Sequence, residues 1–247
     1  MHFKKLFDYS EPRVAAVTIF VVALAAMVWY VGQVVYDIKL ASDTIEVTGS
    51  AKESVVADTA RLVIHIETKT GLFDQSAGTA RLAEAVENVS RYLKEAGLTD
   101  FETPAGSTNA TYIYPQNAEA IQTGYTMNRT VVVRGTDVEK LSNLANDVGP
   151  LNGEGYVVTV GGLELTYSKL DDMRVKLLTE AIKDAAARAE AIASESGREV
   201  GLLRNAVGGV VQVLPQGGVD ISDYGSYDTS SLNKEVMVTT RATFSLE

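Results

Sequence analysis

Hydrophobic and polar positions along the chain form one long apolar segment followed by shorter alternating patterns. Residues Val14–Tyr36 contain no charged side chain, so every face of a helix built from them is apolar. Such a helix rises ~1.5 Å per residue and spans roughly 34 Å, enough to cross a hydrocarbon core of ~30 Å. Surface helices of soluble domains keep a polar face. The segment is therefore predicted to be a transmembrane helix.

The residues that flank this segment indicate its orientation. Three basic residues precede it: Lys4, Lys5 and Arg13. Aromatic residues, which favour a membrane interface, gather toward its other end: Trp29, Tyr30 and Tyr36. The positive-inside tendency therefore predicts a single-pass protein of the cytoplasmic (inner) membrane, with residues 1–13 in the cytoplasm and residues 43–247 exported to the periplasm or cell exterior.

A cleaved signal peptide is the competing interpretation. The apolar run is longer than the ~7–15 residues of a typical signal peptide. Cleavage after Ala41 would also place Lys39 where a small residue is expected. The sequence favours an anchor that is retained and contacts the bilayer through Val14–Tyr36.

Beyond residue 43, strand and helix patterns are mixed. The clearest strand is residues 61–67, where Leu62, Ile64 and Ile66 share one face. Amphipathic helices are predicted over residues 76–96, 137–148 and 169–196, each of them followed by glycine. A change of side-chain parity at Gly161-Gly162 indicates a bulge within a strand.

The last helix has two further expected features. Ser168 is expected to cap its start, with Asp171 and Asp172 placed favourably on the helix dipole. Its apolar stripe, spaced by three and four residues, is expected to consist of Val175, Leu178, Ile182, Ala185, Ala189 and Ile192.

The order of elements predicts an α+β fold with an internal repeat. Strand, helix, strand and strand occur in residues 55–135 and again in residues 154–247, and the short helix 137–148 joins them. We expect a transmembrane helix followed by an exported domain of two similar strand-helix-strand-strand halves, with helices packed on antiparallel sheets.

Charge and composition exclude several functions. The formal net charge is −10, and an acidic surface repels phosphate backbones, so nucleic acid is not an expected partner. The chain contains no cysteine, which excludes disulfides, thiolate catalysis and cysteine-ligated metals.

Few side chains indicate chemistry. His65 is the one histidine beyond the apolar segment, and a surface histidine on a strand is usually ordinary. The acidic stretch Asp220–Asp228 lacks the ligand spacing of an EF-hand. No glycine-rich phosphate loop or nucleophile motif is present. We therefore expect no enzyme and assign no catalytic, cofactor or metal site.

One long segment without periodicity remains, from Pro215 to Asn233. Loops longer than ~12–15 residues are usually functional or disordered. Its residues Pro215, Tyr224 and Tyr227 are the candidate contacts of an oligomer interface, beside any unpaired strand edge.

Residues 45–247 resemble the SIMPL-domain family of bacterial envelope proteins, a domain of unknown function. The opening IEVTGSAKESVVADTARLVIHIET matches the family pattern at Val47, Gly49, Asp58 and Ala60. The segment YTMNRTVVVRGTDVEKLSNLANDV is similar to the family's middle strand and short helix. The later helix matches at Ala181, Asp184, Ala185, Arg188, Ala189, Ile192, Ala193 and Gly197.

The resemblance implies an exported protein, as members typically are. Some members are similar to ring-forming or channel-like homo-oligomers, and some are linked to oxidative-stress tolerance. We therefore expect a membrane-anchored structural or interaction protein that self-associates, with a role in envelope or oxidative stress. A monomeric module that binds a ligand or a protein is the alternative, and a hydrolase that uses carboxylates is a third hypothesis.

Overall fold

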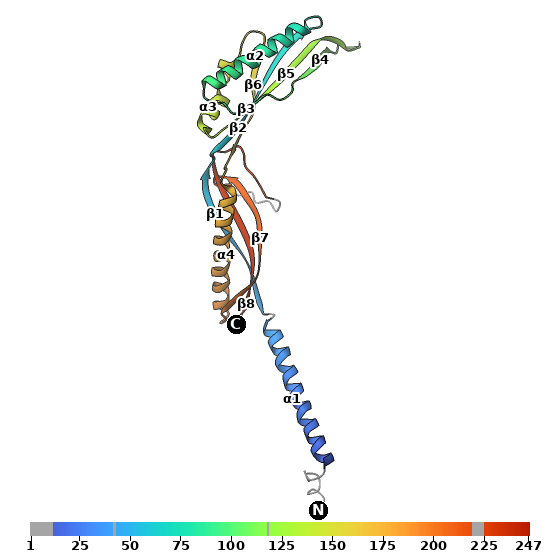
Figure 1. Cartoon of the computed structure of the whole chain (residues 1–247), viewed down its shortest axis with the longest axis vertical. Coiled ribbons are helices and arrows are strands. Elements are labelled where there is room, and N and C mark those ends of the chain that lie inside the picture. Colours follow the sequence, from blue (N-terminus) through green and yellow to red (C-terminus); the bar gives the residue numbers. More distant parts are fainter. Residues whose placement is uncertain (1–11, 42, 118, 219–224) are drawn as a thin grey trace, which may run out of the picture. The chain divides into compact units, whose positions relative to one another are not determined.

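The computed structural model of the chain describes residues 12–41, 43–117, 119–218 and 225–247 (Figure 1). Its helices are α1 (Pro12–Ala41), α2 (Gln75–Glu95), α3 (Val138–Asn146) and α4 (Leu170–Glu195), with the 3-10 turn η1 (Gly149–Leu151). Its strands are β1 (Thr44–Val56), β2 (Thr59–Gly71), β3 (Phe101–Glu102), β4 (Ser107–Ile113), β5 (Ile121–Gly135), β6 (Val157–Thr166), β7 (Val200–Pro215) and β8 (Asn233–Leu246).

The strands form two sheets. One has the order β1-β8-β7, and the other has the order β3-β5-β2-β6, with β4 also paired to β5. These sheets and their helices, together with the apolar helix α1, confirm the predicted α+β class. The predicted helices agree with α2, α3 and α4 to within about two residues at each end.

The described residues divide into two compact units made of interleaved segments. The first contains the chain up to Ala51 together with Leu178–Gly209 and Thr239–Glu247. The second contains Lys52–Leu177 and Val210–Val238. The repeat of halves 55–135 and 154–247 stays a prediction.

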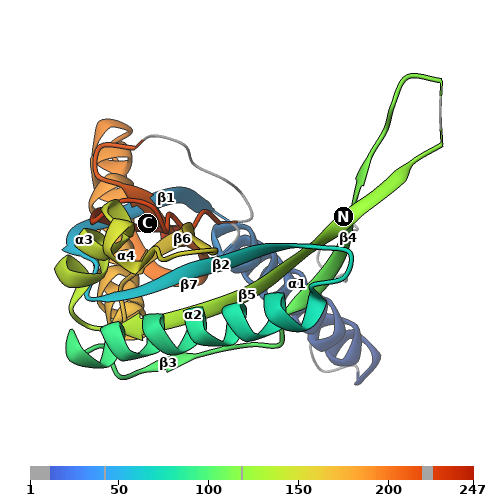
Figure 2. The same ribbon diagram turned by 90° about the horizontal axis from the view of Figure 1, so that it is seen from above.

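The core of the second unit lies between α2 and the sheet of β5, β2 and β6. Figure 2 shows α2 running along this sheet. Leu62, Ile64 and Ile66 of β2 are fully buried, as their alternation predicts. They belong to the same core cluster as Val89 and Leu93 of α2. Burial of each such side chain contributes about 1.5–3 kcal/mol to the stability of this unit.

The glycine pair in β6 forms the predicted bulge. Val63 of β2 is opposite Gly162, whereas Ile64 is opposite Val160, so Gly161 is the extra residue. A β-carbon on Gly161 would collide with the imidazole of His65. The Nδ1 atom of that imidazole lies 3.2 Å from Oγ1 of Thr130 on β5. His65 is therefore a surface residue that covers the bulge on the solvent-facing side of the sheet.

In the first unit, α4 approaches β1 at Gly49. A β-carbon there would collide with the carbonyl oxygen of Ala181 and would lie 2.8 Å from the β-carbon of Ala185. Ser50 donates its backbone N–H to Oδ2 of Asp184 at 2.8 Å. Glycine on the strand and alanine on the helix allow the two backbones to come this close.

This close approach corrects the predicted stripe of α4. Val175 and Ile192, which the spacing placed in the stripe, are exposed. The buried side chains are instead spaced by four residues: Met173, Leu177, Ala181, Ala185, Ala189 and Ala193. Small side chains occupy the contact because the helix lies too near the strand for isoleucine.

We predict that Gly49→Ala lowers the free energy of unfolding by about 1–3 kcal/mol or more, because the added methyl group forces α4 away from β1. The matched control is Gly162→Ala, where a β-carbon meets no atom within 4 Å. The midpoint of thermal unfolding, followed by circular dichroism on the full chain, measures both. Equal midpoints for the two variants would contradict the close contact.

Candidate interaction surfaces

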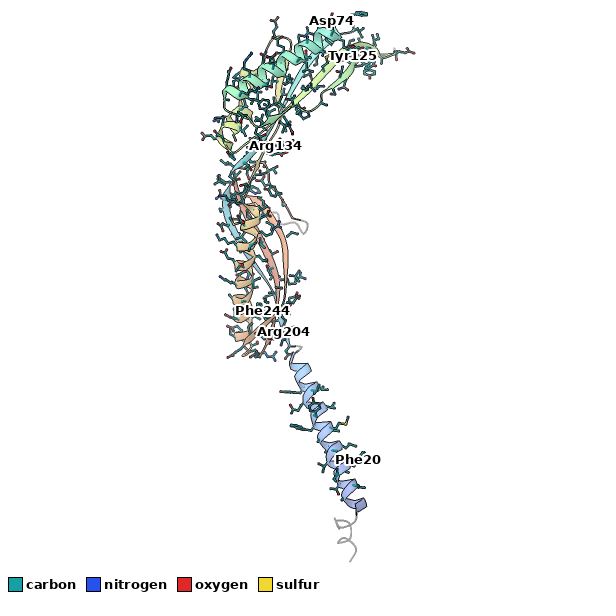
Figure 3. All side chains as sticks on the ribbon, in the orientation of Figure 1. Phe20, Asp74, Tyr125, Arg134, Arg204 and Phe244 are labelled. Atoms are coloured by element: carbon teal, nitrogen blue, oxygen red, sulfur yellow. The ribbon has the colours of Figure 1, made fainter. Side chains whose placement is uncertain are left out.

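The apolar helix α1 is exposed over residues 16–36, where Thr18 is partly exposed. Residues Ala15–Tyr36 form a helix of 22 residues that is long and apolar enough to cross a membrane, and none of its most apolar 18-residue stretch is buried in the protein. Phe20, labelled in Figure 3, is among its exposed side chains. Length and composition alone suit both a membrane anchor and a signal sequence.

Strand β7 is an edge strand of its sheet. Among the strands that the structure describes, it has β8 as its one neighbour in the sheet order. Leu202 and Val207 are 71% and 55% exposed, and Leu203 is exposed too. Arg204, labelled in Figure 3, is the single charged residue in this strand of 16 residues. Edges with so little charge are prone to pair with another strand.

The predicted interface loop is only partly a free surface. Tyr224 lies outside the described residues. Pro215 ends β7 and is exposed, and Tyr227 is exposed while its backbone forms a bridge with Val213. Leu165 of β6 donates its N–H to the carbonyl oxygen of Thr229 at 2.7 Å. The described part of this loop is therefore hydrogen-bonded through its backbone to β6 and β7.

A buried ion pair between Asp228 of the loop and Lys234 of β8 lies at the C-terminal end of this loop. The side chain of Lys234 is 0% exposed, and its Nζ lies 3.1 Å from Oδ2 of Asp228. The same Nζ donates to the carbonyl oxygen of Asp228 at 2.6 Å. Ser230 donates its backbone N–H at 3.0 Å and its hydroxyl at 2.7 Å to the carboxylate, and Ser231 donates its hydroxyl.

These contacts determine the charge of the pair. Burial alone would raise the pKa of Asp228, but the hydrogen bonds from Ser231, Ser230 and Lys234 outweigh it and hold that pKa far below its usual range. The carboxylate therefore stays ionised opposite the buried ammonium group. Sequence patterns placed Lys234 in a strand but gave no sign that it would be buried, because its partners come from the loop.

Other residues singled out in the sequence lie at the start of α4. Asp171 and Asp172 lie in the first turn of α4. Ser168 donates its backbone N–H and its hydroxyl to the carboxylate of Asp58 in the β1–β2 turn, both at 2.7 Å. The cap expected from Ser168 stays a prediction. Among the described residues, no three acidic or histidine side chains are grouped to hold a metal.

An open groove lies on the second unit beside α2 and α3. It has a volume of about 480 Å³, and Tyr92, Leu98, Lys140 and Leu144 are among its lining residues. The carboxylate of Asp137 on its rim accepts the backbone N–H of Lys140 at 3.0 Å, and this bond lowers the pKa of Asp137. That carboxylate is the helix cap of α3, so its arrangement is explained by the fold.

The comparisons with known proteins give one match. The family model described as SIMPL, protein of unknown function (DUF541), matches residues 45–243. The chain belongs to the SIMPL family. No curated protein matches it.

The SIMPL residues recognised in the sequence have structural roles here. Gly49 is a point of close approach between β1 and α4, and Ala181 and Ala185 face it. Gly197, just beyond α4, has a φ of 71°, a backbone conformation that favours glycine. Asp58 holds Ser168 at the start of α4.

Asp184, another SIMPL position, joins the helix to the strand. Its carboxylate accepts the N–H of Ser50 and lies 2.9 Å from Nε of Arg188. The hydrogen bond from Ser50, followed by the contact with Arg188, lowers the pKa of Asp184. Gly49, Asp58, Asp184 and Gly197 therefore maintain the fold.

Asp228→Asn tests the buried pair. We expect the free energy of unfolding to fall by about 3–5 kcal/mol, because Lys234 would be left charged and buried without a counter-ion. Chemical denaturation of the full chain measures this change.

The double variant Asp228→Asn with Lys234→Met serves as the control and should recover much of the loss, since it removes the unpaired charge. Removal of the exposed Lys52 side chain, which pairs with Glu235 at 3.2 Å, should cost less than about 1 kcal/mol. A single variant as stable as the wild type would show that the pair is not buried as described.

Proposed function

We propose that this SIMPL protein is a membrane-anchored structural or interaction protein that self-associates through the edge of β7. The anchor is α1, the N-terminus is cytoplasmic, and the SIMPL domain faces the periplasm or the cell exterior. The proposal includes no catalytic step and no nucleic-acid partner. A role in envelope or oxidative stress follows from the resemblance to family members with such links.

The exposed edge of β7 carries this proposal. Apolar side chains on a strand edge cost free energy in water, and proteins usually protect such edges with charges, prolines or covering loops. Here Arg204 is the one charge, and proline occurs only at the end of the strand, at position 215. Pairing with a second copy covers Leu202, Leu203 and Val207 and satisfies the free backbone groups of the edge.

The symmetry of such a contact limits the assembly. Two identical edges that pair in antiparallel orientation form a closed twofold dimer, because each copy uses the same surface. A ring needs a second surface or a head-to-tail contact. The β7 edge alone therefore supports a dimer, and a larger ring is a further part of the proposal.

Val207→Lys tests self-association. A lysine on the edge places like charges near one another in the paired state, which costs several kcal/mol and should weaken association at least about tenfold. Mass photometry of the full chain in mild detergent, at micromolar concentration and below, should show oligomers for the wild type and monomers for the variant.

The matched control is Val207→Thr, which keeps a β-branched, uncharged residue on the edge and should assemble like the wild type. A wild-type protein that is monomeric at micromolar concentration contradicts the proposal. That result would favour the alternative of a monomeric binding module, for which the groove beside α2 and α3 is the first place to seek a ligand.

A further inference from the structure

The hairpin of β4 and β5 extends beyond the rest of its sheet. Strand β2 ends where Gly71 is opposite Gly124 of β5. Past that point β5 is paired with β4 alone among the described strands, and the last pair is Ile113 with Ile121. Figure 2 shows this hairpin projecting away from α2 and β2.

The hairpin is almost free of charge. Between Glu102 and Arg129 the sequence contains a single charged residue, Glu119. The whole chain, by contrast, is 22% charged. Within residues 103–128, the polar residues of β4 and β5 are instead serine, threonine, asparagine and glutamine, which are neutral.

Apolar side chains cover both faces of the hairpin end. Ile113 and its cross-strand partner Ile121 share one face, and each is 52% exposed. Tyr112, the neighbour of Ile113 in β4, is exposed on the opposite face. Tyr114 follows at the turn and is 79% exposed. A protein partner that docks on one face of a sheet would cover only half of these side chains.

A second exposed apolar turn lies at the same end of the sheet. Leu72 and Phe73 follow Gly71 in the turn between β2 and α2, and Phe73 is 96% exposed. Figure 3 labels Asp74 of this turn and Tyr125 of β5 at this same end of the second unit. Exposed phenylalanine and leucine beside an uncharged hairpin mark an interaction surface.

We propose that the end of the β4–β5 hairpin inserts into the interface of a lipid bilayer. Immersion covers both faces of the hairpin at once, which docking on a flat protein surface does not. Tyrosine rings favour the headgroup level, and isoleucine favours the acyl chains just below it. The apolar helix α1 gives the chain a second segment suited to lipid.

Charge and backbone chemistry specify the kind of insertion. Because residues 103–128 contain no basic residue, the projecting end of the hairpin gains nothing from anionic headgroups, so a zwitterionic bilayer suffices. The outer backbone groups of β4 have no partner strand among the described residues. Unsatisfied backbone groups are costly in hydrocarbon, so the hairpin enters only to the depth of the interface.

A single cysteine tests this proposal, because the natural chain has none. Gln116→Cys at the hairpin turn is labelled with the environment-sensitive dye NBD, and the full chain is reconstituted in phosphatidylcholine vesicles. We expect emission at shorter wavelength than in detergent-free buffer, and a loss of intensity when brominated phosphatidylcholine replaces the ordinary lipid. Bromines near the headgroups should quench more strongly than bromines near the chain ends, and added salt should leave the quenching unchanged.

Two controls separate insertion from general proximity to the vesicle. The label on Glu87→Cys, an exposed position of α2, should show neither shift nor quenching. Replacement of Tyr112, Ile113, Tyr114 and Ile121 by serine should abolish quenching at position 116, whereas Ile192→Ser on α4 should not.

Emission from position 116 that stays at long wavelength and unquenched would overturn the proposal. So would a shift that depends on protein concentration and is insensitive to brominated lipid, since that pattern identifies a second copy of the chain as the occupant. The result is independent of the β7 edge, because Val207→Lys leaves the hairpin intact and should retain the quenching.

Discussion

Apolar side chains that the protein itself does not cover dominate the chemistry of this chain. Exposure of apolar surface to water costs a free energy of roughly 25 cal/mol per Å². Long apolar stretches that a protein does not bury itself therefore mark sites where another molecule covers them. Two such stretches are the helix α1 and the edge of β7. The SIMPL domain, which contains β7, also has a buried core.

The local pattern of the sequence predicts most of this fold. Strict alternation placed Leu62, Ile64 and Ile66 in the core, and a change of parity at a glycine pair located the bulge at Gly161. Both features arise from neighbours in the same strand. The ends of the helices could also be predicted, because a glycine such as Gly197 follows the last helical turn.

Contacts between distant segments were not predictable in the same way. The buried stripe of α4 is determined by how closely the helix approaches Gly49, and helical spacing alone favoured the larger Val175 and Ile192. Lys234 is buried because Asp228 and two serines of a loop surround its ammonium group. Of the candidate interface residues, Tyr227 is exposed and Pro215 ends the edge strand, but the edge itself had no signal beyond low charge.

Retention of α1 in the mature protein is the central claim, and the mass of the protein isolated from membranes tests it most directly. Membranes of cells that produce the full chain are washed with alkaline carbonate, and the intact mass of the protein that remains is determined. A retained anchor predicts that the protein resists the wash and that its mass includes the residues of Ala15–Tyr36. A mature chain that begins near Asp43, or release of the protein by the wash, would contradict the anchor.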